Sequence, residues 1–407
     1  MRVLMVNAFH WLKGGVERTL FDETRWLEAA GHEVGHFAIR DARNAPSPFE
    51  RHFAPAADFA EDTPAWRQLR QLPRAIWSAP AARALAGLLA EWRPDVAHVH
   101  APSRYLTPSV LAELGRSGVP MVMTLHDFKP WCTNRVLYAH GAPCERCRGG
   151  HHWRAAVTGC VQRSHAKSLV GAIEAYAHDR RRAYAGVRLW IAPSRFVRDK
   201  AVSLGAEAGR MRLLAHGVEH TSPAEPPRDL PARFVLFAGR LVDEKGVRLL
   251  PALARSLAPV PLLVAGEGPL RGWLAERGGG SLRLLGHLAS PALAAIRARA
   301  AVVVVPSLFP ETFGYAVAEA QLDGRVVVAS DVGALGELVE QGASGLLVPA
   351  GDAAALALAA RRALEDPAAP AWGEAARARS AKAFEPRTHA AGLVALYREA
   401  IGAASAG

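Results

Sequence analysis

Residues 301–320 read AVVVVPSLFPETFGYAVAEA, and this stretch decides the fold. Five apolar residues, 301–305, end at Pro306, a short loop follows, and a second apolar segment begins at Gly314. Continuous β-branched runs are typical of strands buried on both faces, as in a parallel sheet covered by helices. The stretch therefore predicts one strand–loop–helix unit of an α/β sheet, with a helix that begins near Phe313 or Gly314.

Eleven further apolar runs alternate with segments of helix length. They are 3–7, 33–38, 95–99, 121–125, 189–192 and 212–214, followed by 234–237, 262–265, 282–285, 326–329 and 346–348. Alternation of strand and helix favours βαβ units. Six runs in each half predict the α/β class, with two doubly wound, Rossmann-like domains that face a central cleft.

Residues 221–231 contain four prolines and few apolar residues, a composition typical of an extended linker. This linker separates a predicted N-terminal domain, 1–220, from a C-terminal domain, 232–385. Apolar residues recur at helical spacing at Leu393, Leu396, Tyr397 and Ile401. We expect residues 386–407 to form a helix that packs back on the N-terminal domain.

The composition restricts the classes of protein and partner. Lysine and arginine number 49 against 38 acidic residues, and a net charge of +11 attracts anions such as nucleotides or lipid head groups. We expect no nucleic-acid partner, because no recognised binding motif accompanies the charge. No stretch reaches about 18 uninterrupted apolar residues, and the first is too short for a secretory signal. We expect a cytoplasmic protein, with a place at the inner face of the cell membrane left open.

Glycines and cations follow two of the predicted strands. Gly14 and Gly15 precede a helix, where adjacent glycines allow the backbone to approach a phosphate closely. Arg240 and Lys245 follow the run 234–237, and the pair suits a diphosphate. An ordinary turn and two solvated cations are the alternative. The chain contains neither GxGxxG nor GxxxxGK[ST], which disfavours a dehydrogenase or a kinase.

Two carboxylates and one histidine complete the candidate site. Glu319 lies roughly 7–9 Å along the predicted helix, at about 1.5 Å per residue. It and Glu311 could therefore hold hydroxyl groups at two ends of one ligand, with helix N–H groups meeting its phosphates. His126 follows the run 121–125, at the edge where open α/β sheets bind ligands. A structural histidine and a solvated glutamate are the alternatives.

In this order the motifs resemble those of the retaining glycosyltransferases of family 4, which have the GT-B fold. The resemblance covers nearly the whole chain. The markers are 14–18 (GGVER), 124–127 (TLHD), Gly239 and Arg240 with Lys245 and Gly246, 266–269 (GEGP), and Glu311 seven residues before Glu319 in an E-x7-E pattern.

The resemblance implies a nucleotide-sugar donor and assigns residues to it. The implied donor-binding residues are Gly14, Gly15, Arg240, Lys245, Glu311, Phe313, Gly314 and Glu319. The implied catalytic residues are His126, Arg240, Lys245 and Glu311. On this interpretation Glu319 binds the ribose hydroxyls, Glu311 holds the transferred sugar, the two cations neutralise the diphosphate, and His126 bonds a sugar hydroxyl.

The leaving nucleoside diphosphate gains negative charge, which preorganised cations and amides would stabilise. The chain contains no DxD motif, so we expect no catalytic metal. The family retains the anomeric configuration, and we assign no protein nucleophile. The predicted function is sugar transfer to a glycan or lipid-linked acceptor, in bacterial envelope or exopolysaccharide assembly. The alternatives are a nucleotide-sugar epimerase of the same architecture and a non-catalytic nucleotide-binding scaffold.

All four cysteines, Cys132, Cys144, Cys147 and Cys160, fall in a predicted insert at about 130–165, which follows His126 on the acceptor side. Their C-x11-C-x2-C-x12-C spacing includes one metal-knuckle pair, and four thiolates suit a structural zinc site. Free or disulfide-bonded thiols are the alternative, and His140, His151 and His152 are competing ligands. A subset of similar glycosyltransferases carries such an insert.

The region 146–188 is rich in cations, including 180–182 (RRR), and contains Trp153, Tyr176 and Tyr184. One interpretation is an interfacial helix that meets anionic lipid and brings the enzyme to a lipid-linked acceptor. The other is a solvated helix face.

Overall fold

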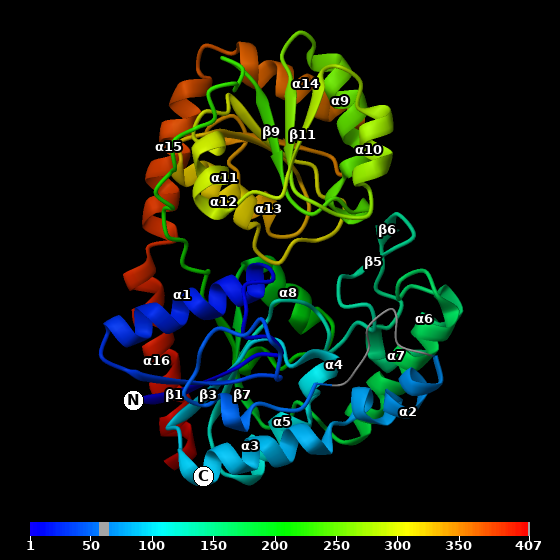
Figure 1. Cartoon of the computed structure of the whole chain (residues 1–407), viewed down its shortest axis with the longest axis vertical. Helices are drawn as coiled ribbons and strands as arrows, with labels where there is room; N and C mark the ends of the chain where they lie inside the picture. The colour runs from blue at the N-terminus through cyan, green and yellow to red at the C-terminus, as the bar shows by residue number, and fades with distance from the viewer. Residues whose placement is uncertain (57–64, 406–407) are drawn as a thin grey trace.

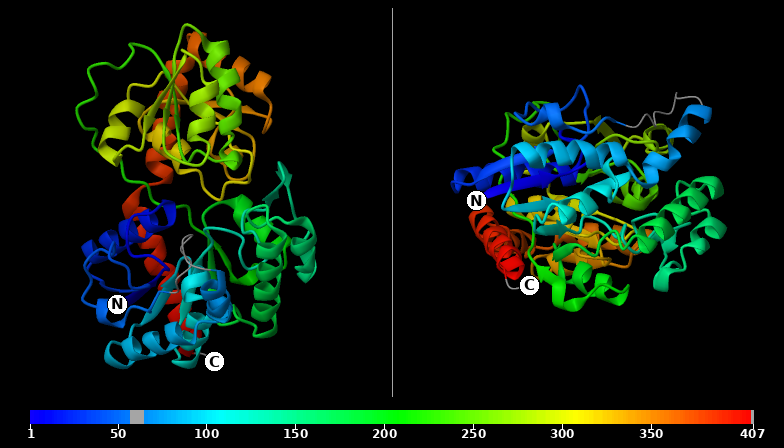
Figure 2. Two further views of the ribbon diagram at one scale, coloured as in Figure 1. Left: turned by 45° about the vertical axis from the view of Figure 1, so that its right-hand side comes forward. Right: turned by 90° about the horizontal axis from the view of Figure 1, so that it is seen from below.

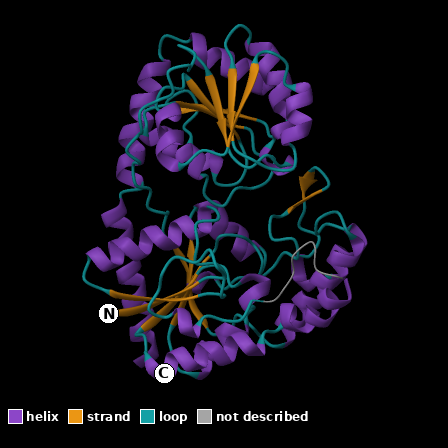
Figure 3. Cartoon of the chain, in the orientation of Figure 1, coloured by secondary structure: helices purple, strands orange, loops and turns teal. Residues whose placement is uncertain are grey.

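The structure, a computed structural model, describes residues 1–56 and 65–405. Two parallel six-stranded sheets form its centre, in the orders β2-β1-β3-β4-β7-β8 and β11-β10-β9-β12-β13-β14. Helices cover both sheets (Figures 1 and 3). Counted within its own domain, the second sheet has the Rossmann order 3-2-1-4-5-6. The predicted class of two doubly wound α/β domains is confirmed.

Every predicted strand is present, within two residues at either end. The N-terminal strands are β1 (Arg2–Val6), β2 (Glu33–Phe37), β3 (Val96–Val99), β4 (Met121–Thr124), β7 (Val187–Ala192) and β8 (Met211–Leu213). The C-terminal strands are β9 (Val235–Ala238), β10 (Leu262–Ala265), β11 (Leu282–Gly286), β12 (Val302–Val305), β13 (Val326–Ser330) and β14 (Gly345–Val348).

The helices of the N-terminal domain are α1 (Gly15–Ala29), α2 (Ala65–Ile76), α3 (Ala79–Glu91), α4 (Ser103–Leu106), α5 (Ser109–Arg116), α6 (Trp153–Thr158), α7 (His165–Arg180) and α8 (Arg195–Ser203). Those of the C-terminal domain are α9 (Leu250–Leu257), α10 (Arg271–Arg277), α11 (Ser290–Arg297), α12 (Tyr315–Leu322), α13 (Leu335–Leu338), α14 (Ala353–Glu365) and α15 (Ala369–Ala383). The last helix is α16 (Pro386–Ser405).

Alternate residues of one strand enter two different cores. Leu4 and Val6 of β1 pack with α3 and α5, whereas Val3 and Met5 pack with α1 and α16. All four side chains are fully buried. Burial on both faces explains why the strands are apolar on successive residues rather than on alternate ones.

Helix α16 returns from the C-terminal domain to the N-terminal domain (Figure 1). It packs against α1, β3, β4 and β7. Leu393 and Tyr397 are fully buried there, and the Tyr397 hydroxyl lies 2.8 Å from Nδ1 of His98. Residues 214–234, between the two large sheets, contain no helix or strand.

The segment between β4 and β7 holds an insert, which stands beside the rest of its domain in both views of Figure 2. It contains the pair α6–α7 and a hairpin of β5 (Tyr138–Ala139) and β6 (Ala142–Pro143), which sequence reasoning did not predict. Tyr184 does not join Trp153 and Tyr176 on the surface of the insert. Its ring packs 5.9 Å from that of Trp190, against the core of the sheet.

Candidate donor site between the domains

The loops that follow β4 and β12 meet across the two domains. The Thr312 hydroxyl donates a hydrogen bond to the His126 carbonyl at 3.2 Å, and the Ser194 hydroxyl donates to the Thr312 carbonyl at 2.9 Å. The Glu337 carboxylate on α13 accepts a bond from the amide of Arg195, at the start of α8, at 3.0 Å. These bonds fix the loop that carries Glu311 against the N-terminal domain.

Glu311 is a mostly buried carboxylate held by a lysine and a serine. Its Oε1 lies 2.5 Å from Nζ of Lys245 and accepts a bond from the Ser307 hydroxyl at 2.6 Å. The residue is 9% exposed. The ammonium charge offsets the cost of desolvating the carboxylate, so the pair presents opposite charges side by side at the carboxyl end of β12.

Two glycines place Lys245 within reach of Glu311. Gly246 has a φ of 71°, and a Cβ there would lie 1.9 Å from the Pro306 carbonyl oxygen. Gly266 has a φ of 137°, and a Cβ there would lie 1.9 Å from the Gly239 carbonyl oxygen. The loops after β9, β10 and β12 therefore pack backbone to backbone, which only glycine allows at these two positions.

Glu319, on α12, lies between two arginines. Arg18, from α1 of the other domain, contacts its Oε1, and Nη1 of Arg297 lies 3.1 Å from its Oε2. Arg297 is itself held by Asp323 at 2.6 Å. Sequence reasoning quoted Arg18 within a motif but gave it no role. It missed Arg297 altogether, because nothing local marks an arginine at the end of α11.

The Gly14–Gly15 loop lies against the start of α12. A Cβ on Gly15 would be 3.5 Å from the Tyr315 ring, and the Thr19 and Tyr315 hydroxyls are 2.6 Å apart. The helix begins at Tyr315, one residue later than the predicted limit, because Gly314 adopts a φ of 102° as its N-cap. The Phe313 ring is buried in the core and lies 5.0 Å from the Tyr315 ring.

Arg240 stands apart from the other predicted catalytic residues. His126, Lys245 and Glu311 gather around residues 311 and 312, as described above. The Arg240 side chain is 71% exposed, and its ion pair is a long one, 3.9 Å from the Glu244 carboxylate.

A stack of rings crosses the domain interface beside this site. The His126 ring lies 5.2 Å from His100 and 5.3 Å from His216, which in turn lies 5.7 Å from Tyr315. Burial lowers the pKa of His126 to about 3 and holds the pKa values of His100 and His216 well below their usual range. His126 is therefore neutral near pH 7, able to exchange hydrogen bonds but not to act as a cation.

Two groups of side chains could hold a metal. Ligand atoms of Glu23, His98 and His100, all buried, lie within 4.8 Å of one another. Glu23 also bonds Nε2 of His389 at 3.0 Å. The four cysteines are unpaired thiols, and all of them line one small cavity in the insert.

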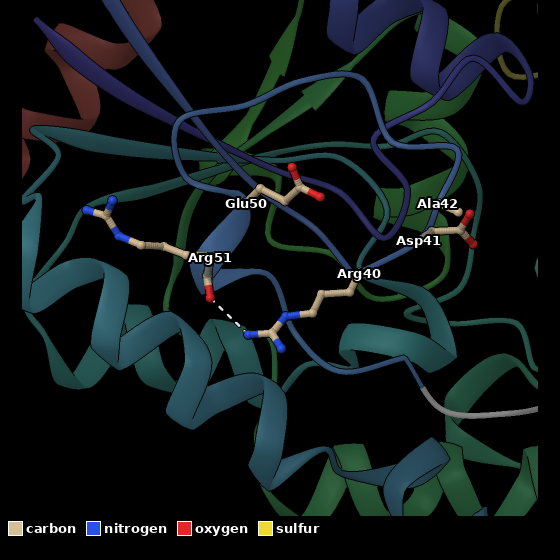
Figure 4. Close-up of a pocket in the computed structure, with 5 residues that line it drawn as sticks. All are labelled: Arg40, Asp41, Ala42, Glu50 and Arg51. Atoms are coloured by element: carbon tan, nitrogen blue, oxygen red, sulfur yellow. Dashed lines mark hydrogen bonds between the residues drawn. The ribbon is translucent and has the colours of Figure 1, made fainter.

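A separate depression lies beyond β2 on the N-terminal domain (Figure 4). It is lined by Arg40, Asp41, Ala42, Glu50 and Arg51, and Arg40 donates to the Arg51 carbonyl at 2.9 Å. None of the predicted site residues lines it, so it is not part of the candidate donor site.

Family models match both domains of the chain. One, described as Glycosyltransferase Family 4, covers residues 13–222, and another, described as Glycosyl transferases group 1, covers residues 232–366. The glycogen synthase of Mycobacterium tuberculosis is 30% identical over 98% of this chain and 94% of its own. The 2-deoxystreptamine glucosyltransferase of Streptomyces kanamyceticus is 30% identical over 80% of this chain and 82% of its own.

Solved structures share the architecture. The sucrose-phosphate synthase of Thermosynechococcus elongatus has a TM-score of 0.73 at 23% identity, over 99% of both chains. HepE of Anabaena, solved in complex with UDP-glucose, has a TM-score of 0.67 at 19% identity, over 98% of this chain and 100% of its own. These likenesses confirm the GT-B fold.

Proposed function

Because this chain belongs to glycosyltransferase family 4, we propose that it transfers a sugar from a nucleotide-diphosphate-sugar donor with retention of configuration and without a catalytic metal. The observation that carries the proposal is the pairing of Lys245 with Glu311 beside the start of α12. A carboxylate for sugar hydroxyls and a cation for phosphate stand there within one hydrogen bond of each other.

The proposed roles follow from what each group can bond. Glu319 accepts hydrogen bonds from the ribose hydroxyls, and Glu311 accepts them from the transferred sugar. Lys245 and the exposed Arg240 neutralise the diphosphate, aided by the backbone amides of residues 313 and 314 and by the Gly14–Gly15 loop. His126, neutral and fixed through its carbonyl, bonds a sugar hydroxyl.

The chemical step requires charge stabilisation at the leaving group. As the glycosidic bond breaks, negative charge builds on the diphosphate, and two preorganised cations lower the barrier without a divalent ion. Glu311 already shares a bond with Lys245, so we do not assign it as a nucleophile. The anomeric configuration is then retained because the acceptor hydroxyl attacks the sugar from the same face that the diphosphate leaves.

Arg240→Ala is the sharpest test, because an exposed side chain with one long ion pair contributes little to folding. We expect kcat to fall by about 10²–10³-fold with the melting temperature unchanged. Arg271→Ala is the matched control, since Arg271 is another exposed arginine of this domain and pairs with Glu267 four residues earlier, at 3.2 Å. Undiminished turnover in Arg240→Ala would refute the role.

Two further measurements address the donor and the stereochemistry. Thermal shift with each nucleotide sugar in turn should single out the donor that stabilises the protein. Proton NMR of the first product should show the donor's own anomeric configuration, and chelator should leave the rate unchanged. Free or epimerised sugar, formed without an acceptor, would favour the epimerase alternative.

We also propose a lipid-linked acceptor in envelope or exopolysaccharide assembly, reached at the inner face of the cell membrane. The support is an apolar face on the insert. Of the nine large apolar side chains exposed in the described residues, five lie on α6 and α7: Trp153, Val157, Leu169, Ile173 and Tyr176. Their spacing of three or four residues puts them on one side of each helix. The exposed arginines at 180–182 lie at the end of α7.

An aromatic and aliphatic face bordered by arginines suits the surface of an anionic bilayer. Ile173→Ser should weaken co-sedimentation with vesicles that contain phosphatidylglycerol. Leu358→Ser, at a still more exposed apolar position on α14, is the control. Equal binding by both variants would contradict the membrane contact. Separately, the described residues include no helix that is long and apolar enough to cross a membrane.

A further inference from the structure

The insert brings its four cysteines to a single place. Cys132 follows β4, Cys144 and Cys147 follow β6, and Cys160 follows α6, yet all four line the same small cavity. Cys132 and Cys147 are buried, and the other two are half-buried. Three separate turns thus bring four thiols to one cavity, and packing of the hydrophobic core alone does not require this arrangement.

The walls of the cavity suit thiolates. Arg146 and Arg148 line it together with the cysteines, and cations stabilise the deprotonated sulfur that metals bind. Glu145 lines the cavity too, but its carboxylate is paired with Lys200 at 2.5 Å. His152 is almost fully buried, and its Nε2 lies 3.0 Å from the Asp179 carboxylate. Its ring lies against Cys147, and its buried Nδ1 meets no other hydrogen-bond partner among the described residues. An imidazole oriented by a carboxylate is a common neighbour of metal sites.

Regular structure gives the cysteine loops little support. The hairpin β5–β6 has two residues in each strand. Arg135, Leu137 and His140, between the first two cysteines, all have φ values between 52° and 75°, which non-glycine residues avoid. Gln162 and Arg163, just after the last cysteine, also have positive φ values, 51° and 55°. Small loop-rich segments of this kind are commonly held by a disulfide or a metal, and the thiols here are unpaired.

We propose that Cys132, Cys144, Cys147 and Cys160 bind one zinc ion as four thiolates. Binding releases the four thiol protons to solvent and needs no oxidant or reductant, because Zn²⁺ keeps its oxidation state. Zn²⁺ with four thiolates carries a charge of about −2, which the two arginines of the cavity wall offset. A thiolate at Cys147 also accepts a stronger, charge-assisted hydrogen bond from the neighbouring His152 ring.

The proposal includes a movement. Within the described residues, no three of these sulfurs lie within 4.8 Å of one another, whereas zinc bonds of about 2.3 Å hold sulfurs closer than that. Zinc must therefore draw the loops inward. Trp131 lines the same cavity, so its environment reports the movement. The centre is independent of the sugar-transfer proposal, because none of its residues belongs to the donor site.

The test is metal content of the full chain, purified with reductant and without added metal. We expect about one zinc per chain, and less than about a tenth would overturn the proposal. Cys144→Ser and Cys160→Ser should each lose the zinc, whereas Val157→Ser, at an exposed position of α6, should keep it. If a cysteine variant fails to fold, the wild-type protein is titrated instead with a mercurial reagent that reacts with thiols, and the released zinc is measured. Zinc should then leave as all four thiols react.

Three results would count against the site. Disulfides, found by thiol counting before and after reduction, would remove the ligands. Stoichiometric iron with visible charge-transfer absorption would overturn the assignment to zinc. Zinc that persists in both cysteine variants but is lost in Glu23→Gln would place it at the buried group of Glu23, His98 and His100 instead. The wild type should also change its tryptophan fluorescence when zinc is removed and restored.

Discussion

The Arg18 guanidinium on α1 contacts the Glu319 carboxylate on α12, so an ion pair joins the two domains at a predicted donor-binding residue. Both side chains are mostly buried, with exposures of 25% and 14%, and such a pair is screened less by salt than a surface pair. Glu319 keeps a second cation, Arg297, on its other oxygen. A ribose hydroxyl that bonds Glu319 must therefore share it with, or displace, Arg18.

This arrangement predicts different outcomes for the two partners. Glu319→Ala should weaken donor binding by about 100-fold, roughly 3 kcal/mol, because the ribose loses its acceptor and two arginines lose theirs. Arg18→Ala should leave donor affinity within about threefold, since Arg297 still holds the carboxylate in place. Calorimetric titration measures both. An equal loss in Arg18→Ala would mean that Arg18 itself binds the donor.

Gly246→Ala should test how the backbone of this loop positions Lys245, because the substitution changes no charge. A Cβ there would lie 1.9 Å from the Pro306 carbonyl, and the residue has a φ of 71°. The loop must move and take Lys245 away from Glu311, so we expect a destabilisation of about 2–4 kcal/mol in urea denaturation. Gly272→Ala on α10 is the control, because nothing lies within 4 Å of its Cβ. Equal stability of the two variants would contradict this account of the loop.

Buried neutral histidines predict a loss of stability in mild acid. Burial lowers the pKa of His36 and of His126 to about 3, against about 6.5 in an unfolded chain. Below pH 6.5 the unfolded chain binds a proton that the folded chain does not. Stability therefore falls as the pH is lowered from about 6.5 toward 3, by about 1.4 kcal/mol per pH unit for each such histidine.

His36→Gln should reduce the pH dependence of the unfolding free energy by the contribution of one proton, because the substitution removes the imidazole that titrates. The glutamine amide can still bond Thr24, whose hydroxyl lies 3.0 Å from Nε2 of His36. Denaturation at pH 7 and pH 5.5 measures the slope, with the exposed His287→Gln as the comparison substitution. An unchanged slope in His36→Gln would show that this histidine is charged in the folded protein.

The central strands were predictable because they are buried on both faces, so the local sequence alone carries the signal, as in 302–305. The hairpin β5–β6 could not be predicted, because strands of two residues are too short to show an alternating pattern in the sequence. Glu311 and Glu319 could be singled out from their spacing around a helix start. Their cation partners could not be paired with them, because Arg18 is 301 residues from Glu319 and meets it only when the domains dock.

Helix α16 has a consequence for the order in which the chain folds during synthesis. The core beneath β1 and β3 holds Val3, Leu20 and Leu27 together with Leu393 and Tyr397. These last two residues leave the ribosome only after the whole C-terminal domain has been made. The first domain therefore emerges with part of its apolar core uncovered, and that core is complete only once α16 has been made. A nascent chain halted between the domains should bind chaperones that recognise exposed apolar surface, and release should follow once α16 is out.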